Sequence, residues 1–307
     1  MSSFGKPFDG AIVIGGPTGS GKTQLAIELA EHLDGEIIGA DSQQLYRDVP
    51  VTTCQPSAVE RARVPHHLIG VLGPEEAMTA ARFGERARQA ALAIQGRGKR
   101  VLLVGGTGLY LRAAIEGLFA GPPADAALRA TLVAQAEALG RPALHARLAK
   151  VDPEAAARLS PNDLTRVVRA LEVHALTGIA QTEHHRRHQK HAPQVHWLAI
   201  DVQREALYAR LAARTSAIFA GILVEARGLA QRGLAAAPVA RALGIAEALS
   251  HLNGALTREA ALLATVQTTR RYAKRQLTWF RAVPGVAFLP AMTLDAAALA
   301  RDLRHTT

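Results

Sequence analysis

Residues 16–23 read GPTGSGKT, and this stretch decides the fold because it matches the pattern G-x-x-x-x-G-K-[ST] in full. The apolar run at 11–14 before it predicts a strand, and the run at 23–33 after it predicts a helix. Between a strand and a helix, the glycines let backbone N–H groups turn inward around a phosphate, and the helix N-terminus adds positive charge. The sequence therefore predicts a di- or triphosphate site formed by Gly16, Pro17, Thr18, Gly19, Ser20, Gly21, Lys22 and Thr23.

Two side chains of this loop have expected roles in binding. Lys22 would reach the outer phosphate, and the hydroxyl of Thr23 would bind a divalent metal. The motif does not identify the reaction, because kinases, ATPases and some transferases share it.

The composition narrows the class of protein. The chain has 307 residues, 49% of them hydrophobic, which favours more than one domain. We expect a cytoplasmic protein without a membrane span, because no leader-like segment is evident and no apolar run reaches about 18 residues. The single cysteine, Cys54, excludes an internal disulfide and a cysteine-based zinc module. A net charge of +10 favours a polyanionic partner such as nucleic acid.

The order of apolar and polar runs predicts an α/β protein. Strand-like and helical runs alternate over residues 1–120, which indicates a parallel sheet; the strands are expected at 11–14, 36–39 and 100–104, and the helices at 23–33 and 79–95. Residues 124–180 read as helical, 181–194 as a polar loop, 195–200 as a strand and the remainder as helix. We therefore predict a P-loop NTPase-like core, residues 1–120 and 196–307, interrupted by an all-helical domain at 121–195.

A histidine cluster lies in the predicted polar loop, at His184, His185, His188 and His191. Its spacing matches no standard set of metal ligands, and the neighbouring cations would repel a metal. We interpret this segment as a solvated basic loop, with phosphate contact as the alternative.

Polar or glycine-rich turns follow two further predicted strands. Asp41, Ser42, Gln43 and Gln44 come directly after the strand near 36–40. Because ligands of open α/β sheets lie at the carboxyl ends of strands, Asp41 is a candidate metal partner or general base, or it caps a helix. The second turn, GGTG at 105–108, either permits close approach of a ligand to Thr107 or is a structural tight turn.

Two helical segments carry cations suited to RNA. Arg166 and Arg169 share one face of the first, although Arg169 could instead pair with Glu172. The second, residues 269–281, holds five cations and three aromatic residues, and its Arg270 and Lys274 share a face. It could follow a phosphate backbone or be an amphipathic helix with a solvated basic face.

Six motifs stand together in one order: GPTGSGKT, DSQQLY, VPHHLIG, GGTGLYL, PNDLTRVVRALEV and TRRYAKRQLTWFR. From about residue 11 to 290, the chain resembles the tRNA dimethylallyltransferase (tRNA isopentenyltransferase) family of bacterial type. The resemblance implies transfer of a dimethylallyl group from dimethylallyl diphosphate to N6 of adenosine 37 in tRNA. Diphosphate and N6-isopentenyladenosine are the implied products, and Mg²⁺ is the implied cofactor. We expect a monomer that binds the tRNA anticodon stem-loop.

The resemblance also implies residue roles. Asp41 would be the general base, Thr107 a catalytic hydroxyl, Arg214 a catalytic contact to the diphosphate, and Thr23 the metal ligand. The residues expected to contact tRNA, with Arg270 and Lys274 added from the basic segment at 269–281, are Asp41, Ser42, Gln43, Gln44, Thr107, Thr165, Arg166, Val167, Val168, Arg169, Arg241, Ala242, Leu243, Gly244, Ile245, Ala246, Arg270 and Lys274.

The chain departs from the family pattern at two places. Thr53-Cys54-Gln55-Pro56 replaces Thr-Ala-Lys-Pro, and Gly244-Ile245-Ala246-Glu247 replaces Gly-Tyr-Lys/Arg-Glu, so two cations and an aromatic ring are missing. Two other classes of protein remain as alternatives. A small-molecule or nucleotide kinase would use the phosphate-binding loop but not the basic segment at 269–281, and a non-catalytic, nucleotide-gated RNA-binding protein would not need Asp41.

Overall fold

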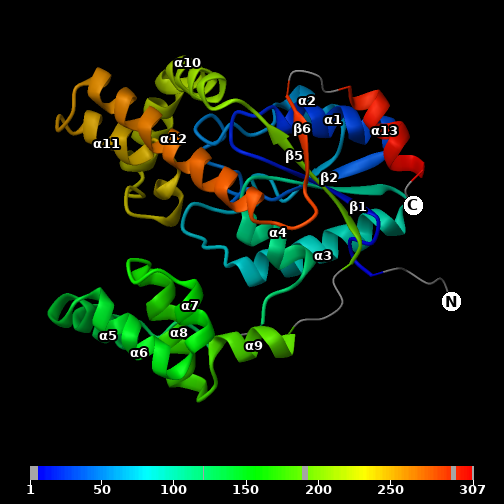
Figure 1. Ribbon diagram of the computed structural model, residues 1–307. Helices are drawn as coiled ribbons and strands as arrows, with labels where there is room; N and C mark the ends of the chain where they lie inside the picture. Colours follow the sequence, from blue (N-terminus) through cyan, green and yellow to red (C-terminus); the bar gives the residue numbers. More distant parts are fainter. Residues whose placement is uncertain (1–5, 120, 189–192, 292–294, 306–307) are drawn as a thin grey trace. The chain divides into compact units, whose positions relative to one another are not determined.

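The computed structural model describes residues 6–119, 121–188, 193–291 and 295–305. They divide into two compact units, one formed by Met1–Ile115 with Pro193–Thr307 and the other by Glu116–Ala192. Figure 1 shows both, coloured along the sequence.

The first unit is built on a parallel sheet in the strand order β3-β2-β4-β1-β5-β6. This confirms the predicted fold class. In chain order the strands are β1 (Ala11–Gly15), β2 (Gly35–Gly39), β3 (His66–His67), β4 (Arg100–Val104), β5 (Val195–Asp201) and β6 (Ala287–Pro290). The helices of this unit are α1 (Lys22–Leu33), α2 (Ala58–Arg63), α3 (Ala80–Gly96), α4 (Gly108–Ile115), α10 (Arg204–Gln231), α11 (Ile245–Leu252), α12 (Arg258–Arg281) and α13 (Ala296–His305), with a 3₁₀ turn at Pro238–Arg241.

Alternation along β1 distributes its side chains to two cores, as a pleated strand requires. Ile12 and Ile14 point into a cluster with α1 and α13, whereas Ala11 and Val13 point into one with α3 and α4. The sheet is thus covered on both faces (Figure 1), which explains why β1 is fully buried and continuously apolar.

A third core lies where α10 packs with α11 and α12, and Phe219, Ile222 and Ala261 are buried there. In the described part of the chain, α10 is the one helix long and apolar enough to span a membrane, with a mean hydropathy of 1.3. It also carries Arg210 and Arg214 and buries residues three or four positions apart, from Leu207 to Leu229, as a core helix does.

The second unit is helical throughout its described residues, with its own core around Leu132, Leu148 and Leu171. Its helices are α5 (Ala126–Leu139), α6 (Arg141–Val151), α7 (Pro153–Arg158), α8 (Leu164–Thr177) and α9 (Gln181–His188).

The structure differs from the local predictions in the polar segment and at the sheet edges. The polar segment 181–188 is a helix, not a loop, and Glu183 pairs there with Arg186 and Arg187 at three- and four-residue spacing. The His184 ring stacks on Phe119 at 5.0 Å instead of being solvated, and His191 lies outside the described residues.

Strands β3 and β6 were missed because they have two and four residues and lie at the sheet edges.

Candidate active site

The phosphate-binding loop joins the central strand β1 to α1, as predicted. Gly19 and Gly21 have φ values of +80° and +98°, a region that favours glycine. The ammonium of Lys22 donates to the carbonyl of Pro17 at 2.7 Å and so lies back across the loop. Burial lowers the pKa of Lys22 to about 8, with Arg214 acting in the same direction against the opposing charge of Asp41.

Asp41 lies at the carboxyl end of β2, close enough to Lys22 and Arg214 for their charges to act on it. Its Oδ1 accepts from the backbone N–H of Gln43 at 2.9 Å, so it closes a turn. No helix starts at this turn, so the helix-cap interpretation was wrong. Burial raises the pKa of Asp41 and outweighs the hydrogen bond from Gln43 and the charges of Lys22 and Arg214. A carboxylate with a raised pKa is a better proton acceptor.

Thr107 joins the end of β4 to the turn that carries Asp41. Because β4 lies between β1 and β2, its end adjoins both of their loops. The Thr107 hydroxyl accepts from the Ser42 N–H at 2.9 Å and donates to the Ser42 hydroxyl at 3.2 Å. The hydroxyl of Tyr272 on α12 interacts with both of these side chains, and burial raises the pKa of Tyr272.

The glycines of the second turn face protein. A Cβ at Gly106 would lie 2.0 Å from Nε2 of Gln276, and one at Gly108 would lie 2.1 Å from the ring of Trp279. Both contacts come from α12, which therefore packs directly on this turn. The observation favours the structural interpretation of these glycines over close approach of a ligand.

Two side chains from distant helices hold Thr18 of the phosphate-binding loop. Arg214 of α10 donates to the Thr18 hydroxyl at 2.9 Å. Gln276 of α12 accepts from the Thr18 N–H at 2.8 Å. The shape of the loop therefore depends on both helices.

A cavity opens between the loop, the Asp41 turn and these two helices. It is lined by Thr18, Asp41, Gln43, Thr52, Thr53, Cys54, Arg214, Thr215, Ile218, Ile222, Leu243, Thr265, Thr269 and Tyr272. Within the described structure, three buried polar atoms around the loop have no hydrogen-bond partner: Ser20 Oγ, Arg214 Nε and Gln276 Nε2. Buried donors without acceptors are costly, and an anionic oxygen beside the loop would satisfy them.

A second cavity is lined by residues that follow Asp41 and shares Gln43 with the first. Its lining includes Ser42, Tyr46, Tyr110 and Arg241. The hydroxyls of Tyr46 and Tyr110 donate to the carbonyls of Glu76 and Met78, at 3.0 and 3.1 Å. Tyr110 is 7% exposed and its ring stacks on Phe83 at 4.2 Å, whereas Tyr46 is half-buried. Of the two, Tyr46 is therefore the ring that can support a flat base by stacking.

The two segments that depart from the family pattern belong to the loops around the Asp41 turn. The Gln55 amide donates to the carbonyls of Gln44 and Tyr46, at 3.0 and 2.7 Å, so it supports the residues after Asp41. In the other segment, Ala242, Gly244 and Ile245 are buried, whereas Arg241 and Ala246 are exposed. The N–H of Leu243 donates to Gln43 at 3.1 Å.

The two cations of α12 that were expected to contact RNA differ in environment. Arg270 is half-buried over the Tyr208 ring, 5.1 Å from its centroid. Lys274 is exposed. Lys274 is thus the better placed of the two for a contact with phosphate.

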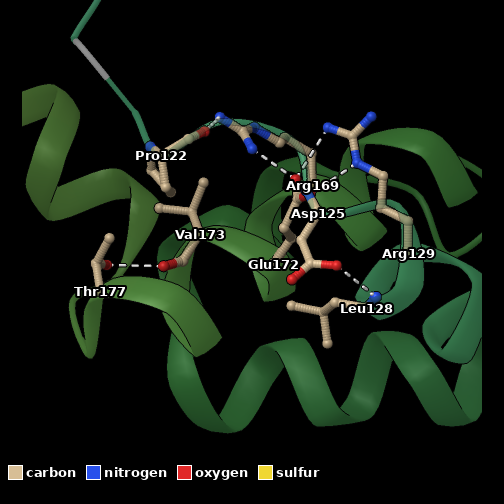
Figure 2. A network of polar contacts seen from close by, with 8 residues as sticks. All are labelled: Pro122, Asp125, Leu128, Arg129, Arg169, Glu172, Val173 and Thr177. Carbon is tan, nitrogen blue, oxygen red and sulfur yellow. Dashed lines mark hydrogen bonds and ion pairs between the residues drawn. The ribbon is translucent and has the colours of Figure 1, made fainter.

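In the second unit, Arg169 belongs to a buried network (Figure 2). The carboxylate of Glu172 is fully buried. Its Oε2 accepts a hydrogen bond from Arg169 at 2.5 Å, and each of its two oxygens accepts one from Arg129 at 2.9 Å. Its Oε1 also accepts from the N–H of Asp125. Burial raises the pKa of Glu172, but the bonds from Arg129 and Arg169 outweigh it and lower the pKa overall. The pairing of Arg169 with Glu172, left open by the sequence, is therefore present.

The other expected RNA contacts of α8 separate into two groups. Val167 and Val168 are 1% and 5% exposed and lie in the helical core, so their side chains do not face solvent. Thr165 and Arg166 are exposed, and the Arg166 side chain retains 73% of its accessible surface beside Asp163.

Sequence reasoning missed the role of Gln276. The signal was present in the four-residue spacing of Tyr272 and Gln276, which puts both on one face of a helix. That this face meets the phosphate-binding loop, more than 250 positions away, could be seen only in the fold.

Two family models and several known proteins match the sequence of this chain. The family model described as IPP transferase matches residues 44–283, and the model described as isopentenyl transferase matches residues 10–66. A tRNA dimethylallyltransferase from Anaeromyxobacter sp. (strain K) is 49% identical over 293 residues, 94% of this chain and 95% of that protein. One from Myxococcus xanthus is 47% identical over 281 residues, 90% of this chain and 91% of that protein.

Solved structures agree with these matches. The tRNA isopentenylpyrophosphate transferase of Bacillus halodurans superposes with a TM-score of 0.71 at 36% identity, covering 96% of this chain and 94% of that one. A eukaryotic dimethylallyltransferase acting on tRNA gives a TM-score of 0.78 at 29% identity, covering 95% of this chain and 77% of that one. The chain belongs to the tRNA dimethylallyltransferase family.

Proposed function

We propose that this enzyme transfers a dimethylallyl group from dimethylallyl diphosphate to N6 of adenosine 37 in tRNA. The products are diphosphate and N6-isopentenyladenosine. One observation carries the proposal: a half-buried carboxylate with a raised pKa, Asp41, shares a cavity with Arg214 and with Thr18 of the phosphate-binding loop. The cavity thus combines a proton acceptor with an anion site.

The loop and Arg214 serve the leaving group. An adenine amine is a weak nucleophile because its lone pair is delocalised into the ring, so the allylic carbon must be activated by departure of diphosphate. Lys22, the backbone N–H groups of the loop and the unpartnered Arg214 Nε stabilise the charge that develops on the departing oxygens. Donors held in place before the reaction are worth several kcal/mol at such a step.

Asp41 takes the proton that N6 loses as the new carbon–nitrogen bond forms. Its carboxylate also directs the amine toward the allylic carbon. Thr107 and Tyr272 hold the turn that carries Asp41, through the contacts to Ser42. The second cavity, with the Tyr46 ring in its wall, suits the acceptor base, which must leave the RNA stack to react.

Mg²⁺ is the proposed metal, with Thr23 as its protein ligand. Among the described residues, no group of three His, Cys, Asp or Glu side chains could hold a metal by itself. This fits Mg²⁺, which keeps several waters and commonly binds through one or two protein ligands and substrate phosphates. When bound, it neutralises charge on the departing diphosphate.

The proposed tRNA partner is the anticodon stem-loop. Arg166, Arg241 and Lys274 are exposed cations of the segments assigned to RNA, and phosphate contacts dominate affinity for nucleic acid. A monomeric state and a cytoplasmic location stay predictions.

Mass spectrometry of tRNA from a strain lacking this gene tests the proposal in the cell. We expect N6-isopentenyladenosine at position 37 to be lost and to return when the wild-type gene is restored. Unchanged modification in the deletion strain would contradict the assignment. An Asp41→Ala gene serves as the control for catalysis and should not restore the base.

A further inference from the structure

The cavity beside the phosphate-binding loop is polar at one end and apolar at the other. Arg214, Ile218 and Ile222 line it from α10 at intervals of four residues. Since a helix rises about 1.5 Å per residue, this row covers about 12 Å. Arg214 contacts Thr18 at one end, whereas Ile222 is 1% exposed in the apolar core at the other end. The row therefore leads from the phosphate end to an apolar end.

Threonines on the cavity wall present methyl groups. The hydroxyls of Thr215, Thr265 and Thr269 each donate to the carbonyl four residues earlier in their own helix, at 2.7 to 2.8 Å. A hydroxyl engaged in this way leaves the methyl group as the free part of the side chain. The wall between α10 and α12 is therefore more apolar than its residue types indicate.

The far end of the cavity is closed by close packing. A Cβ placed on Gly244 would lie 2.9 Å from Cγ2 of Thr265 and 3.4 Å from Cδ1 of Ile222. The three residues thus meet with no space for a further methyl group. Leu243, beside them, also lines the cavity.

We infer that Ile222 limits the transferred chain to five carbons and so selects dimethylallyl diphosphate over longer allylic diphosphates. This inference rests on the proposed function. With the diphosphate held at Thr18 and Arg214, the allylic group lies beside Ile218. A second isoprene unit would reach about one helical turn further, roughly 5.4 Å, into the space that Ile222 fills.

The test compares geranyl diphosphate with dimethylallyl diphosphate as donors to the same tRNA. For the wild type, we expect kcat/KM to be at least about 100-fold lower with geranyl diphosphate, because a closed wall rejects additional carbons. Ile222→Ala should raise the ratio of geranyl to dimethylallyl transfer at least about tenfold. Val224→Ala is the matched control on the same helix, since Val224 is 66% exposed, and it should leave the ratio unchanged.

Ile222→Val keeps the inference testable if Ile222→Ala does not fold, and it should shift the ratio in the same direction by a smaller factor. Equal use of both donors by the wild type would overturn the inference. So would an unchanged ratio in a folded Ile222 variant that still transfers dimethylallyl. If the wild type transfers neither group, the proposed function itself fails.

Discussion

At the residue scale, Asp41 is the group on which the proposed chemistry depends. Asp41→Asn keeps the size of the side chain but removes the proton acceptor. General-base catalysis contributes about 10²–10⁴-fold, so we expect the rate constant of transfer in single-turnover assays to fall by that factor. The affinity for tRNA, measured by filter binding, should change by less than about threefold because phosphate contacts dominate it. Near-normal turnover of the variant would show that Asp41 is not the general base.

We expect Lys22 to set an upper pH limit for binding the diphosphate of the donor. Its pKa is lowered to about 8, mainly by burial, so the lysine loses its charge above that pH in the free enzyme. We expect the affinity for inorganic diphosphate with Mg²⁺, measured by calorimetry, to decrease as the pH rises through 8. Lys22→Arg is the control because arginine stays protonated. Its affinity should not decrease over this range, and an identical decrease would assign the effect to another group.

At the element scale, the docking of α12 on the glycine-rich turn stabilises the first unit. Gly108→Ala would place a Cβ 2.1 Å from the Trp279 ring. Because forced overpacking costs about 1–3 kcal/mol, we expect that loss in the free energy of unfolding, measured with urea. Gly228→Ala is the matched control, since nothing lies within 4 Å of its Cβ position in α10. The control should stabilise the protein slightly, because alanine favours helix over glycine.

The buried carboxylate of Glu172 organises the start of α5 and the middle of α8. Glu172→Gln removes the charge that faces Arg129 and Arg169. Both arginines keep some access to water, with side chains 42% and 29% exposed, so we expect a loss of about 1–3 kcal/mol. Glu183→Gln is the surface control and should destabilise the protein much less, because ion pairs of exposed side chains are screened by water. Equal effects of the two variants on urea unfolding would contradict a special role for Glu172.

For the molecule as a whole, we expect the net charge of +10 to act through the exposed cations that we propose face tRNA. Arg166→Gln and Lys274→Gln should each weaken tRNA binding and reduce the slope of log K against log[salt] by about one phosphate contact. Lys99→Gln is the control. Lys99 directly precedes β4 and pairs with Asp34, so it lies at the opposite end of this strand from Thr107. Slopes that do not change in the first two variants would place the RNA elsewhere.

Much of the fold could be predicted from local patterns. The strands β1, β2 and β4 are short apolar runs, and the helices α1 and α3 have apolar residues at helical spacing. The motif at 16–23 predicts the junction between β1 and α1. The very short β3 and β6 and the helix α9, which is stabilised by ion pairs, lack such patterns. The convergence of Asp41 and Thr107 followed from parallel strand order. The contacts of Gln276 and Ile222 depend on how α10 and α12 return to the sheet, and no local signal encodes that.

We propose that the loop at 16–23 holds the diphosphate of a prenyl donor and does not use ATP. Purified enzyme should be mixed with Mg²⁺, unmodified tRNA and dimethylallyl diphosphate labelled in the allyl group, without ATP. We predict that label enters tRNA, that Asp41→Asn reduces the rate, and that added ATP does not increase it. Absence of label in tRNA, together with ATP-dependent phosphorylation of a small molecule, would contradict the account.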